Sequence, residues 1–207
     1  MPDIGSLLSC WEKRNIKGHS CPDKKAALDK ILKIIPDSAS VGFSGSVTLD
    51  QLGIVQALEK RGNKVFNQNK PGISRDESLK VRREGASADY YLASANAVSL
   101  TGELVFLSAY GNRTSGISYA PKVIAVCGIN KITADLNDAL KRAREYATPL
   151  NCKRLNWNTP CLKDGICHND ICIFPEYKRM CCQALIIEGE IIDGRFQVIM
   201  VGESLGY

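Results

Sequence analysis

Apolar side chains recur every three or four residues in several stretches of this chain, which is the spacing of an amphipathic helix. The clearest case begins at Pro22, which suits a first helical turn, and ends before Pro36. Another helix begins after Thr48, whose hydroxyl suits an N-cap, and a third is closed by Pro149. Helices are therefore predicted over residues 4–15, 22–35, 49–60, 76–84 and 134–146.

Short runs of strand-forming residues separate these helices. The run KVIAVC at residues 122–127 is apolar throughout, which is typical of a strand buried on both faces, and we expect it to be central. The last two predicted strands should pair around a turn at Gly189 or Asp193-Gly194. Strands are predicted over residues 40–43, 64–67, 89–95, 103–110, 122–127, 184–188 and 196–201. Strands that alternate with helices predict an α/β fold, a three-layer sandwich with a mainly parallel sheet.

The length of 207 residues suits a single domain. Within it we expect an N-terminal helical segment, residues 1–35, to pack on a domain formed by residues 36–207. A cysteine-rich loop at residues 152–182 belongs to that domain. The composition, with 44% hydrophobic and 24% charged residues, is that of an ordinary globular protein.

Charge and hydropathy exclude two classes of partner. The net charge of +5 is spread along the chain rather than clustered, which disfavours nucleic-acid binding and is compatible with a small anionic substrate. No apolar run approaches the ~20 residues that cross a bilayer, and the N-terminus lacks the features of a secretory signal. We therefore expect a cytoplasmic protein that interacts with neither membranes nor nucleic acids.

Three loops that follow predicted strands carry groups suited to an anion. Because parallel strands end at the same edge of a sheet, we expect the three loops to converge on one anion-binding cleft. Arg113 suits a bidentate clamp on a carboxylate or phosphate, and Lys131 adds a point charge. The alternative is that these are only turn residues. The candidate binding residues are Gly45, Ser46, Thr48, Asn96, Gly111, Asn112, Arg113, Asn130 and Lys131.

No catalytic residue can be assigned from the sequence. The loop at residues 42–48 has neither the ending of a Walker loop nor the dinucleotide-binding fingerprint, and no protease or nicotinamide motif occurs elsewhere. Glu103 is compatible with a general base, and a solvated carboxylate at the start of a strand is the simpler interpretation.

Cysteines crowd into one segment of the chain. Six of the nine lie between Cys152 and Cys182, and in a reducing compartment such thiols are free, metal-bound or redox-active. An iron–sulfur cluster or Zn is the candidate cofactor, although the segment contains no Cys-x2-Cys pair. Free packing thiols and redox-active thiols remain the alternatives. The candidate metal ligands are Cys161, Cys167, Cys172 and Cys181.

Six stretches together resemble the LUD (lactate utilisation) domain family. They are VGFSGSVTLDQLGIVQAL, ASANAVSLTGEL, YGNRTSGI, PKVIAVCGINKI, TPCLKDGIC and VIMVGESLGY, and they occur in the family's order over about residues 36–207. The chain departs from the family pattern at Ser44, where a glycine is usual, and at residues 107–109, which lack the usual acidic residue.

The resemblance implies the fold shared by ribose-5-phosphate isomerase, glucosamine-6-phosphate deaminase and CoA-transferases. It also implies a role in the metabolism of lactate or a related 2-hydroxy acid, as a component of a lactate-oxidising complex with partner proteins that carry iron–sulfur clusters. Two other functions remain open. One is a transferase or isomerase for a phosphorylated or CoA-linked substrate, by analogy of fold. The other is a non-catalytic accessory protein.

Overall fold

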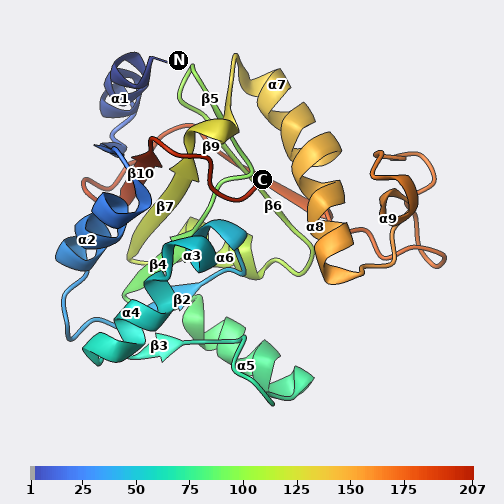
Figure 1. Cartoon of the computed structure of the whole chain (residues 1–207), viewed down its shortest axis with the longest axis horizontal. Helices are drawn as coiled ribbons and strands as arrows, with labels where there is room; N and C mark the ends of the chain where they lie inside the picture. Colours follow the sequence, from blue (N-terminus) through green and yellow to red (C-terminus); the bar gives the residue numbers. More distant parts are fainter. Residues whose placement is uncertain (1–2) are drawn as a thin grey trace.

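The computed structural model describes residues 3–207, and its larger sheet has six strands in the order β1-β10-β7-β4-β2-β3 (Figure 1). All neighbouring strands in this sheet are parallel, as predicted. The central position predicted for the run at residues 122–127 is confirmed, because β7 lies between β10 and β4. The strands are β1 (Lys17–Cys21), β2 (Val41–Phe43), β3 (Val65–Phe66), β4 (Tyr90–Ala93), β7 (Lys122–Gly128) and β10 (Phe196–Val201).

A second sheet of four strands, in the order β8-β5-β6-β9, was not predicted. Its strands are β5 (Ala97–Ser99), β6 (Leu104–Ser108), β8 (Ile132–Thr133) and β9 (Gln183–Ile187). β6 pairs with both β5 and β9 in antiparallel fashion. The predicted pairing of residues 184–188 with residues 196–201 is therefore wrong. β9 is partly exposed and pairs with β6, whereas β10 is almost wholly buried and lies inside the larger sheet.

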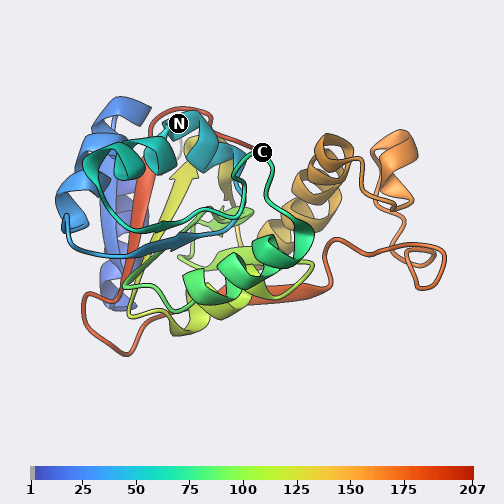
Figure 2. The same cartoon turned by 90° about the horizontal axis from the view of Figure 1, so that it is seen from below.

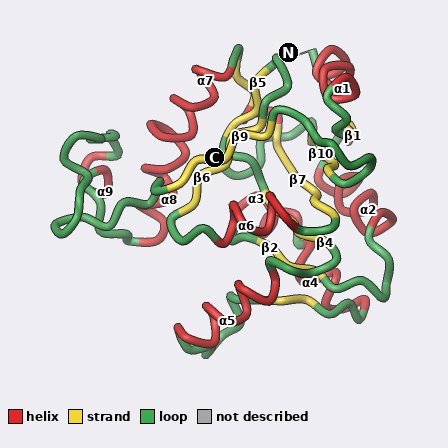
Figure 3. The backbone as a smooth tube through the Cα atoms, turned by 180° about the vertical axis from the view of Figure 1, so that it is seen from behind, coloured by secondary structure: helices red, strands yellow, loops and turns green. Residues whose placement is uncertain are grey.

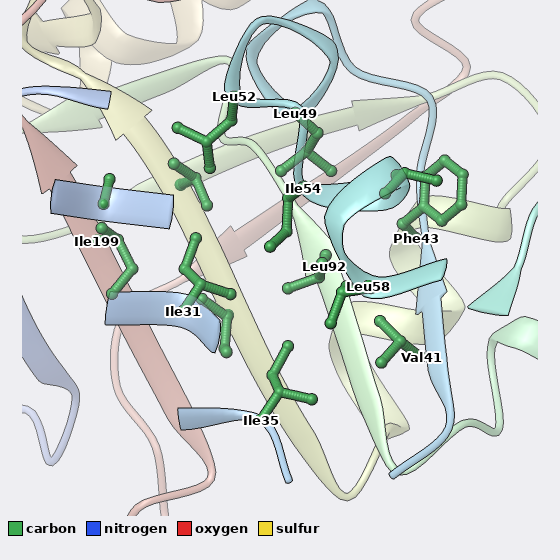
Figure 4. Close-up of a cluster of buried hydrophobic side chains, with 14 of the residues drawn as sticks. Ile31, Ile35, Val41, Phe43, Leu49, Leu52, Ile54, Leu58, Leu92 and Ile199 are labelled. Atoms are coloured by element: carbon green, nitrogen blue, oxygen red, sulfur yellow. The ribbon is translucent and has the colours of Figure 1, made fainter. Parts of the chain in front are cut away.

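The two faces of the larger sheet are covered differently, and the three-layer arrangement is confirmed (Figures 1 and 2). Helices α2 (Lys24–Ile34), α3 (Val47–Leu52) and α4 (Ile54–Arg61) cover one face. Successive residues of a strand point to opposite faces, so Leu92 and Ile199 pack beneath these helices (Figure 4). The opposite layer combines α1 (Ile4–Lys13) and α6 (Asn112–Tyr119) with side chains of the smaller sheet.

The predicted helix at residues 49–60 is divided into α3 and α4 by Gly53, whose φ of 69° is in the left-handed region. The N-cap is Ser46, whose side chain accepts from the Leu49 N–H, so the assignment of Thr48 as the cap is wrong. Thr48 lies inside the first turn and is buried. This position lets its hydroxyl face the loops that follow β4 and β7.

The predicted helix at residues 134–146 continues past Pro149. α7 (Leu136–Lys141) runs through a π-helical segment, η2 (Arg142–Ala147), into α8 (Thr148–Leu155). Pro149 follows the π-helical segment within a continuous helix, and the wider π turn accommodates the proline ring and its missing N–H. Beyond α8, the short helix α9 (Cys161–Asp164) and the rest of the cysteine-rich loop project away from the larger sheet (Figure 3).

The N-terminal segment is not purely helical. Residues 17–21 form β1, which pairs in parallel with β10 at the edge of the larger sheet. The sequence KGHSC lacks an apolar alternation because only Cys21 is buried, and this explains why the strand escaped prediction. The remaining elements are α5 (Arg75–Gly85), which packs against β2 and β3, and η1 (Ile129–Lys131). Within residues 3–207 no helix combines the length and the apolar character that a membrane crossing requires.

Candidate functional site

The loops that follow β2, β4 and β7 meet at the carboxyl edge of the larger sheet. They enclose a small polar chamber of about 40 Å³ together with Arg113 from the first turn of α6. Hydroxyl and amide side chains make up much of its wall, including Asn151 of α8. Six of the predicted binding residues lie around this chamber: Gly45, Ser46, Thr48, Asn96, Arg113 and Lys131.

The guanidinium of Arg113 is held by neutral acceptors. Its Nη1 donates to Asn96 Oδ1 at 3.2 Å and to the Leu107 carbonyl at 2.9 Å. Its Nη2 donates to the Gly45 carbonyl at 2.8 Å, and its Nε donates to Ser44 Oγ at 3.3 Å. Burial lowers the pKa of Arg113 from its usual value, although the group stays charged. Four of the five N–H donors are thus engaged, and one on Nη2 is left for a ligand.

Lys131 lies behind the chamber with only 3% of its surface exposed. Its Nζ donates to Ser94 Oγ at 2.7 Å, to Thr48 Oγ1 at 2.9 Å and to the Ala95 carbonyl at 3.1 Å. Burial lowers the pKa of Lys131 to about 8, and the positive charges of Arg142 and Arg113 act in the same direction. The ammonium group is therefore poised to titrate just above neutral pH.

A third cation, Arg142 of η2, completes a positively charged centre. Its Nη1 donates to the Asn96 carbonyl at 2.5 Å, and its Nη2 donates to the Asn130 carbonyl at 3.0 Å. Within residues 3–207, none of Arg113, Lys131 and Arg142 forms an ion pair with a carboxylate. Three cations are thus gathered around Asn96 with their charge uncompensated by the protein.

Three predicted residues lie elsewhere around this centre. Asn130 holds the segment at residues 205–206, since its Oδ1 accepts from the Leu205 N–H and its Nδ2 donates to the Gly206 carbonyl. Gly111 is the N-cap of α6, with a φ of 82°, and lines neither this chamber nor the larger one beside it. Asn112 lines a second and larger chamber.

The larger chamber has a volume of about 570 Å³ and shares Gly45, Ser46, Asn96, Arg113 and Asn151 with the small one. Two further arginines line it, Arg82 of α5 and Arg154 of α8, and Asp50 is the only carboxylate in its wall. Tyr110 and Trp157 add an aromatic surface. Partial burial raises the pKa of Asp50, and the positive charge of Arg154 opposes this shift.

Glu103 does not belong to either chamber. Its carboxylate accepts from the hydroxyls of Ser99 and Thr101 and pairs with Arg14 of α1 at 2.6 Å. These hydrogen bonds, with the charge of Arg14, outweigh the effect of burial and lower the pKa of Glu103 to about 2. The residue ties α1 to the smaller sheet, and the structure gives no support to a role as general base.

The four cysteines predicted as metal ligands, Cys161, Cys167, Cys172 and Cys181, line one cavity of about 20 Å³. All of them are free thiols, and burial raises the pKa of Cys167 and Cys172. Over residues 3–207, however, no three His, Cys, Asp or Glu side chains are grouped closely enough to hold a metal ion. His168 pairs with Asp164 at 2.7 Å.

Comparison with known proteins decides the family. The model of the LUD domain matches residues 8–201, which is nearly the whole chain. The chain belongs to the LUD domain family. Membership supports a role related to lactate utilisation. A search of the curated proteins gives no match.

Solved structures resemble this LUD domain at low sequence identity. A DUF162 family protein from Deinococcus radiodurans is 12% identical, with a TM-score of 0.52, over 98% of this chain and 100% of that one. This likeness supports the fold alone. Ribose 5 phosphate isomerase A from Neisseria gonorrhoeae is 17% identical over 55% of this chain and 54% of that one, with a TM-score of 0.36. The eIF2B delta protein from Chaetomium thermophilum is 14% identical over 68% and 58%, with a TM-score of 0.37.

The sequence did not predict the side chains that α5, α8 and the following loop bring to the larger chamber of this LUD domain. Arg82 lies in a helix whose sequence is mostly polar, and Arg154 lies beyond the proline that was predicted to end its helix. No local pattern distinguishes them from surface arginines. Asp50 had a weak signal, because it lies in the first turn after the Gly45-Ser46 loop.

Proposed function

We propose that this LUD-domain protein binds the carboxylate of lactate or a related 2-hydroxy acid in the small chamber, as part of 2-hydroxy-acid oxidation. The observation that carries the proposal is that two cations without a carboxylate partner, Arg113 and Lys131, line this chamber, and a third, Arg142, is bound to the Asn96 carbonyl next to them. Cations removed from water are costly unless they are paired, and neutral carbonyls and hydroxyls offset only part of that cost. A bound anion supplies the missing charge.

The geometry of the chamber suits a carboxylate with a neighbouring hydroxyl. The spare Nη2 donor of Arg113 and the ammonium of Lys131 supply the positive charge, and a volume of about 40 Å³ limits the guest to a small polar group. Ser46 and Asn151 line the same space and can hydrogen-bond to a 2-hydroxyl. The small chamber also suits one phosphate group, which keeps a phosphorylated substrate as the second candidate.

Calorimetric titration with lactate and its uncharged amide, lactamide, tests the proposal. The two differ in charge at nearly constant size, so the cation centre should bind lactate and leave lactamide unbound. Inorganic phosphate in a third titration separates the two candidates. Equal affinities for lactate and lactamide would contradict the proposal. Tighter binding of phosphate than of lactate would favour the phosphorylated substrate.

We further propose that Cys161, Cys167, Cys172 and Cys181 bind a single metal ion. Thiolates are preferred donors of Zn²⁺, and a cavity of about 20 Å³ has room for one ion. Since no three of these side chains are grouped as ligands, binding requires the loop to close around the ion, which cross-links it. We assign the iron–sulfur clusters of a lactate-oxidising assembly to partner proteins.

A further inference from the structure

The larger chamber is far more spacious than a three-carbon acid needs. Its volume of about 570 Å³ falls in the range of sites that enclose drug-sized ligands, roughly 300–1,000 Å³. It adjoins the small chamber through Asn96, Arg113 and Asn151. A guest in the small chamber therefore leaves room for a second ligand beside it.

The net positive charge in the wall of the larger chamber favours binding of an anion. Arg82, Arg113 and Arg154 face one carboxylate, Asp50, so the wall carries a net charge of +2 when all four are ionised (three minus one). Within residues 3–207, Arg82 and Arg154 form no ion pair. The Nε of Arg82 is also buried without any hydrogen-bond partner. An unpaired buried donor is costly, which sets Arg82 apart from an ordinary surface arginine.

The aromatic surface beside these cations suits a planar ring. Tyr110 and Trp157 meet edge to face, with their ring centroids 5.9 Å apart and their planes at 90°. Tyr110 is 51% exposed, so part of its ring remains open to a guest. The indole Nε1 of Trp157 donates to the Lys178 carbonyl at 2.5 Å, which holds the ring in place. Arg82 lies 6.0 Å from the centroid of Tyr110 and so joins the cationic and aromatic surfaces.

We infer that the larger chamber binds a nucleotide, with its base against Tyr110 and Trp157 and its phosphates between Arg82 and Arg154. Arginine pairs with phosphate through parallel hydrogen bonds, and bases stack on aromatic rings regardless of base identity. This site adjoins the carboxylate site, with Asn96, Arg113 and Asn151 in the walls of both, and it holds a second ligand rather than the 2-hydroxy acid itself. It goes beyond the proposed function, because the small chamber can bind lactate whether or not a nucleotide binds.

Calorimetry with the full chain tests this inference, with ADP as the probe and adenosine and inorganic phosphate as its two halves. ADP should bind more tightly than either half by about tenfold or more, because the ring and the phosphates engage different walls. Arg82→Gln should weaken ADP binding roughly tenfold, the usual effect of losing a charged hydrogen bond. Tyr110→Ala should weaken it by about fivefold or more through lost stacking.

The chain offers matched controls for both variants. Arg83→Gln changes an exposed arginine next to Arg82 on α5, and Tyr119→Ala changes a tyrosine of α6 that is 92% exposed. Neither control should alter ADP binding. If ADP does not bind, or if Arg82→Gln behaves like Arg83→Gln, the nucleotide site is wrong.

Lactate titrations of the same variants distinguish a failure of the nucleotide site from a failure of the proposed carboxylate site. Arg82→Gln and Tyr110→Ala should bind lactate as the unaltered chain does. Normal lactate binding without ADP binding would overturn the nucleotide site alone. ADP binding without lactate binding would support the nucleotide site and contradict the carboxylate site.

Discussion

Arg113 and Asn96 meet at the junction of the two chambers, where Arg113 Nη1 donates to Asn96 Oδ1 at 3.2 Å. The same amide oxygen accepts from the Leu107 N–H at 2.9 Å, and the backbone carbonyl of Asn96 accepts from Arg142. One asparagine thus fixes two cations and the end of β6. Arg113 lines both chambers, where Asp50 is the one carboxylate among the described residues, whereas Arg142 contacts the Asn96 carbonyl without lining either chamber.

Replacing Arg113 should weaken lactate binding without unfolding the protein. Arg113→Gln removes the charge and the spare donor and should cost about 1.5–3 kcal/mol of binding free energy, the usual contribution of a charged hydrogen bond. Arg113→Lys keeps the charge but loses the planar fork, so its affinity for lactate should lie between those of the unaltered chain and Arg113→Gln. Calorimetric titration with lactate measures both variants.

Arg75→Gln is the matched control for this prediction, because Arg75 is an exposed arginine at the start of α5, outside the cleft. It should bind lactate normally. Circular dichroism of each variant separates lost binding from lost fold. Unchanged lactate binding in folded Arg113→Gln would show that Arg113 is a turn residue and does not bind the ligand.

Lactate binding should weaken as the pH rises through about 8, the pKa of Lys131. The protonated ammonium attracts the carboxylate, and above this pKa the neutral amine does not, so affinity is highest below the pKa and falls above it. Arg113 and Arg142 stay charged throughout, and the Cys127 thiol beside Lys131 has a raised pKa and stays neutral in this range. The fall should therefore be partial.

Lys131→Met isolates this effect. The variant should bind lactate more weakly at neutral pH and should lose the dependence on pH between about 7 and 9.5, because its remaining cations do not titrate there. Titrations at several pH values compare it with the unaltered chain. An identical pH profile in both proteins would show that another group controls binding.

The sequence predicted the central strand correctly for a physical reason. β7 is apolar on both faces, and such a run has few places in a fold other than the interior of a parallel sheet. The loops after β2, β4 and β7 then meet at one edge. The predicted loop at residues 111–113 follows β6 of the smaller sheet instead, so the argument from parallel strands does not account for the position of Arg113.

The smaller sheet and the larger chamber depend on tertiary contacts that leave no local pattern. β9 has the composition of a strand, but whether it pairs with β6 or with β10 is decided by packing. Tyr110 and Arg82 are 28 residues apart and meet only because α5 packs near α6. Periodicity within one element cannot reveal such a meeting.

The ion pair between Glu103 and Arg14 should make the protein less stable in acid. The pKa of Glu103 is lowered to about 2 in the folded state, so its stabilising effect is complete above the ordinary glutamate value near 4.5. It is lost as the pH falls from there to about 2. Glu103→Gln should lower the free energy of unfolding at neutral pH by roughly 2–4 kcal/mol and flatten its dependence on pH in that window. Urea denaturation at several pH values measures this, and an unchanged slope in the variant would contradict it.

Metal binding by the cysteine-rich loop should show both in stoichiometry and in the order of the loop. Purified without air and supplied with zinc, the chain should bind about one equivalent through its four thiols. Bound metal should slow amide exchange in residues 159–182, because ligation couples to folding.

Cys167→Ser removes a ligand and should lower zinc affinity by about tenfold or more. Cys182→Ser changes an exposed cysteine outside the cavity and should leave affinity unchanged. Zinc content well below one equivalent, with unaltered exchange in the loop, would instead favour free packing thiols. Arg113 and Lys131 line the small chamber and lie outside this cavity, so lactate binding should survive Cys167→Ser, and its loss there would connect the two sites.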